Sequence, residues 1–208
     1  MDSYCKICFE RISDYSLYNL IKRKNILCEK CFSRMNAKFI PFKIGNVKGI
    51  SIYEYTDFIK ELIYKFKGCY DYELKDVFLS RYLTYFRLKY HGFYIVCVPS
   101  YHIEDERRGF NHVKAIFESL KLKELSILKK KIPHKQSDQS SFGRHKINDV
   151  IDIDENILLK GKKILLVDDI MTTGSTLLTS IDLLKSKGAK TIEILVIAKT
   201  KMKQKDEY

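Results

Sequence analysis

The run 164–177 constrains the fold more than any other part of the chain, and it reads Ile-Leu-Leu-Val-Asp-Asp-Ile-Met-Thr-Thr-Gly-Ser-Thr-Leu. Its four leading apolar residues predict a strand that is buried on both faces, as in a parallel sheet. Two adjacent carboxylates, Asp168 and Asp169, follow at the end of that strand. A turn around Gly174 then leads into an amphipathic helix, expected at 175–187. We therefore expect an α/β protein with a polar site at the carboxyl edge of its sheet.

The turn after this acid pair (Asp168 and Asp169) has the composition of a phosphate-binding loop. Its backbone can point N–H groups at a phosphate, and the following helix adds its positive N-terminal end. Glycine allows a close approach because it has no Cβ, and the hydroxyl groups can donate further hydrogen bonds. Two neighbouring carboxylates can accept hydrogen bonds from two ribose hydroxyls, so a phosphorylated sugar suits the arrangement. The expected phosphate-binding residues are Thr172, Thr173, Gly174, Ser175 and Thr176.

This pattern resembles the phosphoribosyl-pyrophosphate (PRPP) motif of type I phosphoribosyltransferases, which is a hydrophobic strand, Asp-Asp and then Thr-Thr-Gly-x-Thr. The resemblance implies a mostly parallel sheet flanked by helices. It also implies a PRPP site in which Asp168 and Asp169 are the catalytic acids that hold the ribose hydroxyls, with Mg²⁺ bridging hydroxyl and pyrophosphate oxygens. An acidic strand end before a glycine turn also occurs in unrelated α/β proteins. The chain has no Gly-x-x-x-x-Gly-Lys-Ser/Thr, so a nucleoside-triphosphate P-loop is not supported.

Four of the six cysteines form two knuckles, which are separated by 19 residues. Two such turns can complete a tetrahedral zinc site. Disulfides would require an oxidising compartment, which nothing in the sequence suggests. Four thiolates leave no open position for water, so the zinc is expected to be structural and to supply folding energy that a segment of about 35 residues lacks. The expected metal ligands are Cys5, Cys8, Cys28 and Cys31.

The chain of 208 residues is long enough for one α/β domain and a small appendage. It has no run of 18 or more apolar residues, so no membrane span is expected. The start lacks the basic and apolar regions of a signal peptide, and we expect a cytoplasmic protein. The net charge of +12 favours polyanionic partners such as nucleic acid, although a lysine-rich composition is also what an AT-rich genome produces.

The cysteine knuckles predict a zinc-ribbon-like module at 1–36, the resemblance implies a phosphoribosyltransferase-like domain at 37–200, and a charged tail is expected at 201–208. Residues 37–49 are expected to form a linker or an extended crossing. Strands are expected at 50–55, 93–98, 124–129, 163–168 and 192–197, and helices at 57–66, 72–89, 110–120 and 175–187. Strands that alternate with helices imply a mostly parallel sheet with right-handed crossovers.

Ligands of an open parallel sheet bind beyond the carboxyl ends of its strands. Three polar segments meet that condition: the loop of the acid pair, the segment after Pro99 and a long loop at 133–148. Their arginines suit a pyrophosphate leaving group, with solvent-exposed loop charge as the alternative. The candidates for contact with pyrophosphate or DNA are Ser100, Arg107, Arg108 and Arg144.

The whole chain resembles the ComF family, the ComFC-type competence proteins with a phosphoribosyltransferase domain. In that family a four-cysteine knuckle precedes a segment ending in Lys-x-Lys-Gly, which is 65–68 here. A strand ending in Val-Pro, here 98–99, then precedes an Arg-x-x-x-Arg-Gly-Phe-Asn-Gln block. Residues 107–112 read Arg-Arg-Gly-Phe-Asn-His, so the upstream Arg falls on Glu104 and the final Gln on His112. A later Gln-x-x-Leu pattern before an Arg and an Asn has approximate counterparts in Gln139, Phe142, Arg144 and Asn148.

The resemblance leaves two functions open. The first is a phosphoribosyltransferase that uses PRPP and Mg²⁺, acts in DNA uptake during natural transformation and has an unidentified acceptor. The second is a non-catalytic module that binds single-stranded DNA or senses PRPP with the same loop, helped by basic and aromatic side chains. A helicase-like ATPase of the uptake machinery is an expected partner. The aromatic candidates for base stacking are Tyr101, Phe110 and Phe142.

Overall fold

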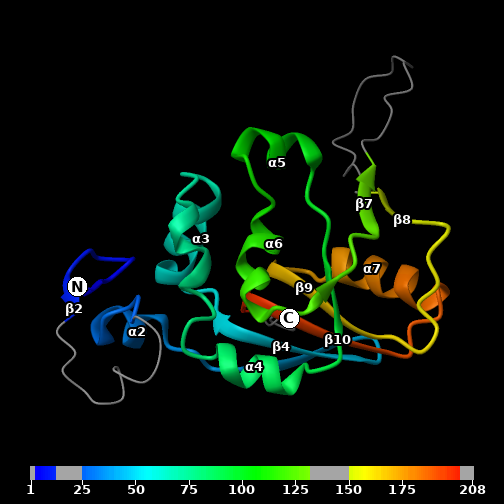
Figure 1. Cartoon of the computed structure of the whole chain (residues 1–208), viewed down its shortest axis with the longest axis horizontal. Helices are drawn as coiled ribbons and strands as arrows, with labels where there is room; N and C mark the ends of the chain where they lie inside the picture. The colour runs from blue at the N-terminus through cyan, green and yellow to red at the C-terminus, as the bar shows by residue number, and fades with distance from the viewer. Residues whose placement is uncertain (1–2, 13–24, 132–149, 202–208) are drawn as a thin grey trace, which may run out of the picture.

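The computed structural model describes residues 3–12, 25–131 and 150–201. Its centre is a six-stranded sheet with the strand order β3-β4-β10-β9-β5-β6 (Figure 1). Five of these strands run parallel, and β3 is antiparallel to β4. The expected fold class, a mostly parallel sheet flanked by helices, is confirmed. The strand bounds are β3 Ile40–Ile44, β4 Val47–Glu54, β5 Tyr94–Cys97, β6 Lys123–Glu124, β9 Lys163–Met171 and β10 Thr191–Lys199.

Side chains of the central strands alternate between the two faces of the sheet and so build two cores. Leu165 and Val167 of β9 pack against α3, α4 and α6, whereas Ile164 and Leu166 pack against α7 and the β7–β8 pair. Both faces are apolar because both are covered, as expected for a parallel sheet. The bounds are α3 Asp57–Lys67, α4 Leu83–Lys89, α6 His112–Phe117, α7 Ser175–Ser186, β7 Leu128–Lys131 and β8 Val150–Ile153.

Helix α3 lies where the sequence places a helix, and its ends have local causes. The Thr56 hydroxyl accepts the N–H of Ile59 at 3.4 Å and caps the first turn. The buried residues recur at helical spacing and end with Phe66, which is fully buried. Gly68 follows and donates its N–H to the carbonyl of Tyr64. Lys67 is therefore the last helical residue and is free to extend its side chain over the carboxyl edge of the sheet.

The segment at 37–49, expected to be a linker or an extended crossing, contains strand β3, the turn after it and the start of β4. Strand β3 pairs with β4 through a two-residue turn in which Gly45 has a φ of 54°, as a type II′ turn requires. Pro41 obscures this strand in the sequence because proline is excluded from central strands. It is tolerated here because β3 lies at the edge of the sheet.

The single helix expected at 72–89 is broken in the structure. A 3₁₀ helix, η1 (Tyr72–Asp76), is followed by turns before α4 begins. The Tyr53 hydroxyl donates to the carbonyl of Phe78 at 2.8 Å inside the core, within the segment of turns between η1 and α4. Hydrophobic periodicity alone does not reveal this interruption of the helix.

Four smaller differences concern the elements near the site. A short helix, α5 (His102–Arg108), occupies the segment expected as a loop after Pro99, and Gly109 ends it with a φ of 81°. The strand expected at 124–129 is divided between β6 and β7. Strand β9 continues past the acid pair to Met171. The helix expected at 110–120 is α6 with a short 3₁₀ extension, η2 (Glu118–Leu120).

The cysteine-bearing segment packs beside α3 (Figure 1). It consists of β1 (Ser3–Tyr4), β2 (Arg11–Ile12) and α2 (Glu29–Met35). Cys5 and Cys31 are buried in the same core cluster as the apolar face of α3. The boundary at residue 36 stays a prediction, and the tail expected at 201–208 lies, apart from Lys201, outside the described residues. Within the described ranges, no helix is both long and apolar enough to cross a bilayer.

Candidate functional site

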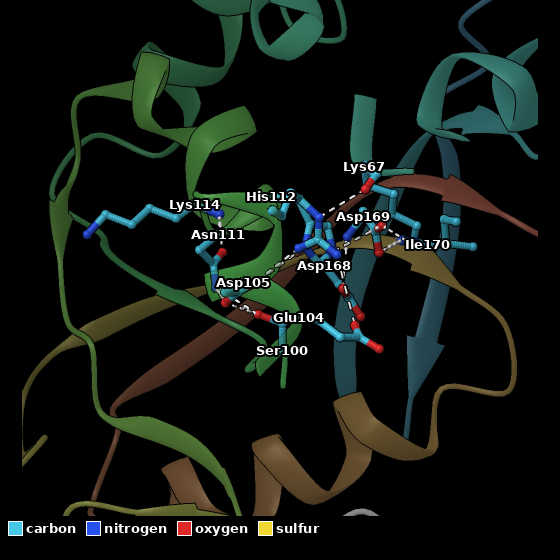
Figure 2. Close-up of polar contacts among 11 residues, drawn as sticks. Lys67, Ser100, Glu104, Asp105, Asn111, His112, Lys114, Asp168, Asp169 and Ile170 are labelled. Carbon is cyan, nitrogen blue, oxygen red and sulfur yellow. Dashed lines mark hydrogen bonds and ion pairs between the residues drawn. The ribbon is translucent and has the colours of Figure 1, made fainter. Parts of the chain in front are cut away.

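The candidate site lies at the carboxyl edge of the sheet, where β9 brings the acid pair close to residues from three other segments (Figure 2). Asp169 is buried, whereas Asp168 is half-buried. The Lys67 ammonium lies 2.8 Å from Asp169 Oδ2, and His112 Nε2 lies 3.3 Å from the same oxygen. Asp168 Oδ1 accepts the backbone N–H of Asp169 at 2.9 Å. The two acids therefore have different surroundings even though they are neighbours in sequence.

These surroundings move the two pKa values apart. Burial, followed by the charge of Asp169, raises the pKa of Asp168 well above its ordinary value. Burial also raises the pKa of Asp169, but the hydrogen bond from His112 and the charge of Lys67 outweigh it and hold that pKa below its ordinary value. Asp169 is therefore the ionised member of the pair, and Asp168 is the one that more readily carries a proton.

Arg108 does not form the open cationic rim that the sequence suggests. Its side chain is 8% exposed, and Nε donates to the Lys67 carbonyl at 3.0 Å. Nη1 lies 2.9 Å from Asp105 Oδ1 and 3.1 Å from His112 Nδ1. The guanidinium is thus committed to protein partners. Arg107 is exposed and remains open to a ligand.

Ser100 is likewise drawn into a local network. Its hydroxyl donates to Asp105, and Asn111 Nδ2 donates to both Ser100 Oγ at 2.9 Å and Asp105 Oδ2 at 2.7 Å. The side-chain oxygen of Asn111, Oδ1, accepts the backbone N–H of Lys114 at 2.8 Å and caps α6. This network fixes the start of α6 and therefore the position of His112.

The phosphate loop (residues 172–176) joins β9 to α7. Gly174 is the N-cap of α7 and has a φ of 79°, a conformation that disfavours residues with a Cβ. Thr172, Thr173 and Ser175 are exposed, and the hydroxyls of Thr173 and Ser175 lie 3.1 Å apart. The loop therefore presents hydroxyls and the N-terminus of a 12-residue helix to solvent.

Replacing Gly174 with Ala is expected to destabilise the protein for two separable reasons. The left-handed backbone costs about 1–2 kcal/mol for a residue with a Cβ. A Cβ at this position would also lie 3.0 Å from Ile44 Cδ1 of β3. Gly161 has the same φ of 79° but open space around it, so Gly161→Ala isolates the backbone cost.

In urea unfolding we expect Gly174→Ala to lose more stability than Gly161→Ala. Adding Ile44→Val, which removes the Cδ1 methyl, should recover the difference, measured against Ile44→Val alone. Equal losses in the two glycine variants would show that the contact with β3 does not shape the loop.

The remaining sequence candidates are placed as follows. Thr176 is half-buried in the first turn of α7, and its carbonyl accepts the Ser180 hydroxyl at 2.8 Å. Phe110 packs against Phe66 and Tyr72, so it serves the core more than a ligand. Tyr101 is half-buried with the Lys130 ammonium 4.2 Å from its ring centre. The loop expected at 133–148, which carries Gln139, Phe142, Arg144 and Asn148, lies outside the described residues.

The four cysteines of the two knuckles converge, and their sulfur atoms all lie within 4.8 Å of one another. Cys8 Sγ and Cys28 Sγ are 3.6 Å apart. A Zn–S distance of about 2.3 Å in a tetrahedral site requires sulfur atoms about 3.8 Å apart. The cluster therefore fits zinc in both donor type and spacing and could hold a metal ion.

Sequence reasoning did not select four residues that the structure brings to the site. Each of them either contacts Asp169 directly or holds in place a residue of the network around it. Two motifs of the family resemblance could have pointed to these residues. Lys-x-Lys-Gly lies at the end of α3, and Arg-Gly-Phe-Asn-His joins the end of α5 to the start of α6. The four residues are Lys67, Asp105, Asn111 and His112.

Comparison with known proteins identifies the class. Residues 106–208 match the family described as the phosphoribosyl transferase domain. With the parallel sheet, and with the acid pair followed by a glycine-capped helix, this match defines a protein with the type I phosphoribosyltransferase fold. Solved structures with a similar fold include the purine phosphoribosyltransferase of Pyrococcus horikoshii Ot3 (24% identity, TM-score 0.40, covering 60% of this chain and 73% of the other). Another is the APRTase of Giardia lamblia (22% identity, TM-score 0.45, covering 80% and 83%).

Two relatives, both competence proteins, indicate a narrower group within this class. The competence protein ComFC of Streptococcus pneumoniae is 29% identical over 192 residues, which cover 92% of this chain and 84% of the relative. ComFC of Bacillus subtilis is 31% identical over 140 residues, which cover 66% and 58% of the two chains. The chain is thus similar over most of its length to competence proteins named ComFC, and it carries a phosphoribosyltransferase domain and a four-cysteine cluster.

Proposed function

We propose that this chain binds PRPP with Mg²⁺ at the carboxyl edge of β9 and acts in DNA uptake during natural transformation. The observation that carries the proposal is the acid pair at the end of a central strand, directly before a glycine-capped helix N-terminus. The relatives named competence proteins support the biological role. A ligand with both a phosphate and vicinal hydroxyls suits this arrangement better than a simple anion does.

Different residues are proposed to bind different parts of PRPP. The 5′-phosphate lies on the phosphate loop, where exposed hydroxyls and the N-terminus of α7 favour a dianion. Asp168 accepts a hydrogen bond from a ribose hydroxyl, because it is the more accessible acid. Carboxylate oxygens are also the donors that Mg²⁺ prefers, so the acid pair suits a metal bound together with PRPP. Arg107 is the exposed cation best suited to the pyrophosphate.

Turnover would require the pyrophosphate to leave while positive charge develops at the anomeric carbon. Fixed negative charge on Asp169 would stabilise the positive charge at the anomeric carbon, and the arginine would stabilise the leaving group. We propose a phosphoribosyltransferase activity with an unidentified acceptor. The competing hypothesis, a non-catalytic module that binds single-stranded DNA or senses PRPP, predicts ligand binding without pyrophosphate release.

Calorimetry with PRPP and Mg²⁺ tests the sugar site. We expect Asp168→Asn to bind PRPP at least about tenfold more weakly, because a charge-assisted hydrogen bond contributes about 1.5–3 kcal/mol. Asp182→Asn, at an exposed aspartate in the middle of α7, is the matched control and should bind like the wild type. The proposal fails if the wild-type protein does not bind PRPP.

A second measurement separates the two hypotheses. Pyrophosphate release from PRPP is followed across a panel of nucleobases and single-stranded DNA. Release with any acceptor supports a transferase. Binding of PRPP without release across the panel supports the non-catalytic module, and a strong salt dependence of DNA affinity would identify electrostatic DNA binding.

A further inference from the structure

Three residues around Asp169 form a closed ring of contacts with it, which we call the support ring: Lys67, Arg108 and His112, together with Asp169 itself. Figure 2 shows Lys67 and His112 beside Asp169. The Lys67 ammonium and His112 Nε2 both contact Asp169 Oδ2, at 2.8 and 3.3 Å. Arg108 closes the ring, because Nη1 contacts His112 Nδ1 at 3.1 Å and Nε donates to the Lys67 carbonyl at 3.0 Å. Lys67 is thus held at both its backbone and its side chain.

The ring determines which nitrogen of His112 carries the proton. A guanidinium can only donate hydrogen bonds, so the ring nitrogen that faces Arg108 must accept one. His112 Nδ1 therefore bears a lone pair, and Nε2 carries the hydrogen that points to Asp169. The same Arg108 Nη1 lies 2.9 Å from Asp105 Oδ1, which helps to hold the guanidinium in place. The imidazole is thus a bridge with one donor and one acceptor nitrogen.

The side chains of the support ring are mostly buried, so losing one of these contacts would leave a buried polar group without a partner. The side chains of Asp169, His112 and Arg108 are 8%, 10% and 8% exposed. Asp169 Oδ2 already receives two donors, and Oδ1 accepts the N–H of Ile170 at 2.7 Å. Both oxygens of this acid are therefore engaged by the protein. Asp168 is the more accessible of the two acids.

We propose that Lys67, Arg108 and His112 are positioning residues that hold and orient the Asp169 carboxylate, so that Asp168 is the single acid of the pair that contacts the ligand. This inference rests on the proposed function, and it assigns different roles to two acids that the motif presents as equivalent. Asp169 acts through its fixed charge, and His112 acts through Asp169. The assignment predicts that a side chain able to accept from Arg108 and to donate to Asp169 can replace the imidazole of His112.

The first test reads the tautomer of His112 and needs no PRPP. Histidine side-chain ¹⁵N NMR on the full chain, with His112 assigned by its absence in His112→Gln, should show a bare Nδ1 and a protonated Nε2 at neutral pH. A protonated Nδ1 would overturn the proposal, because Arg108 could not then donate to it. This readout stands even if the protein binds no PRPP, so it separates failure of the inference from failure of the proposed function.

The second test compares two replacements of His112. Glutamine can accept from Arg108 with its oxygen and donate to Asp169 with its amide, whereas leucine can do neither. We expect His112→Gln to bind PRPP within about threefold of the wild type, and His112→Leu to lose roughly tenfold to 100-fold, since a buried charged group loses a partner. His102→Leu, whose side chain is 82% exposed on α5, is the control and should bind normally.

The comparison is made on variants whose far-UV circular dichroism matches that of the wild type. Equal losses in the glutamine and leucine variants would show that His112 acts through its shape alone. Unchanged affinity in the leucine variant would show that Asp169 needs no support from this side. Either result overturns the positioning role, and the NMR test decides the case in which His112→Leu does not fold.

Discussion

Asp168→Asn is expected to raise the thermal stability of the ligand-free protein, and Asp169→Asn is expected to lower it. Burial and the neighbouring carboxylate raise the pKa of Asp168, so ionisation of this acid is disfavoured in the folded state. A neutral amide removes this penalty, and we expect a gain of about 1 kcal/mol at neutral pH, the ordinary size of a single-substitution effect. For a chain of this length the melting temperature should rise by roughly 2–4 °C.

Asp169→Asn has the opposite effect because it removes the charge that Lys67 and His112 both contact. Lys67 is 35% exposed, so part of its charge is solvated and the loss is smaller than for a fully buried pair. We expect a loss of about 2 kcal/mol and a melting temperature lower by roughly 4–8 °C. Differential scanning calorimetry of the two variants and of Asp182→Asn, the surface control, measures all three. Shifts of the same sign in Asp168→Asn and Asp169→Asn would contradict the different roles of the two acids.

The pH dependence of these shifts follows from the direction of each pKa change. The contribution of Asp168 is fully present below its ordinary pKa of 3.8 and is lost as the pH rises through the higher folded value. The advantage of Asp168→Asn over the wild type should therefore be largest near neutrality and shrink as the pH falls toward 3.8. The contribution of Asp169 is present above its ordinary pKa and is lost as the pH falls toward the lower folded value.

Loss of the cysteine cluster is expected to give the largest stability change in the molecule. If the cluster binds zinc, the metal contributes on the order of 10 kcal/mol of apparent free energy to the fold around it. Cys5 and Cys31 are buried in the core that also contains the apolar face of α3. Removal of the metal should therefore destabilise the main domain as well as residues 3–36.

Cys31→Ser and treatment with a chelator should each lower the melting temperature and abolish stoichiometric zinc, measured by atomic emission on the purified protein. Cys69→Ser is the matched control, because Cys69 is exposed and lies outside the cluster. Proteolysis should also cut near α2 earlier in the Cys31→Ser variant. Full retention of the melting temperature after zinc has been removed would refute a structural metal.

Sequence patterns predicted the parts of this molecule that local chemistry determines. The strand before the acid pair, the helix after Gly174 and the apolar face of α3 are readable because burial repeats with the period of each element. The four knuckle cysteines are readable because their spacing is short. The convergence of these cysteines agrees with the zinc prediction, while the ligand roles of the site residues stay predictions.

The rest depends on contacts between distant residues. Nothing near Phe78 in the sequence shows that its carbonyl accepts the Tyr53 hydroxyl in the core. Pro41 argues locally against a strand that the edge of the sheet tolerates. Arg108 reads as a free cation in sequence, yet Asp105 and the Lys67 carbonyl engage it. The support ring was not predictable, because its members come from three helix ends and one strand.

The support ring also bears on the order of folding. Lys67 and Asp169 are 102 residues apart, and Arg108 contacts the Lys67 carbonyl across 41 residues. Contacts between such distant residues form slowly, because long loops must close before the contacts stabilise the chain. The ring can close only after β9 has joined the sheet and both α3 and α6 have packed on it. Binding competence should therefore appear in the last kinetic phase of refolding, after most helical signal has been regained.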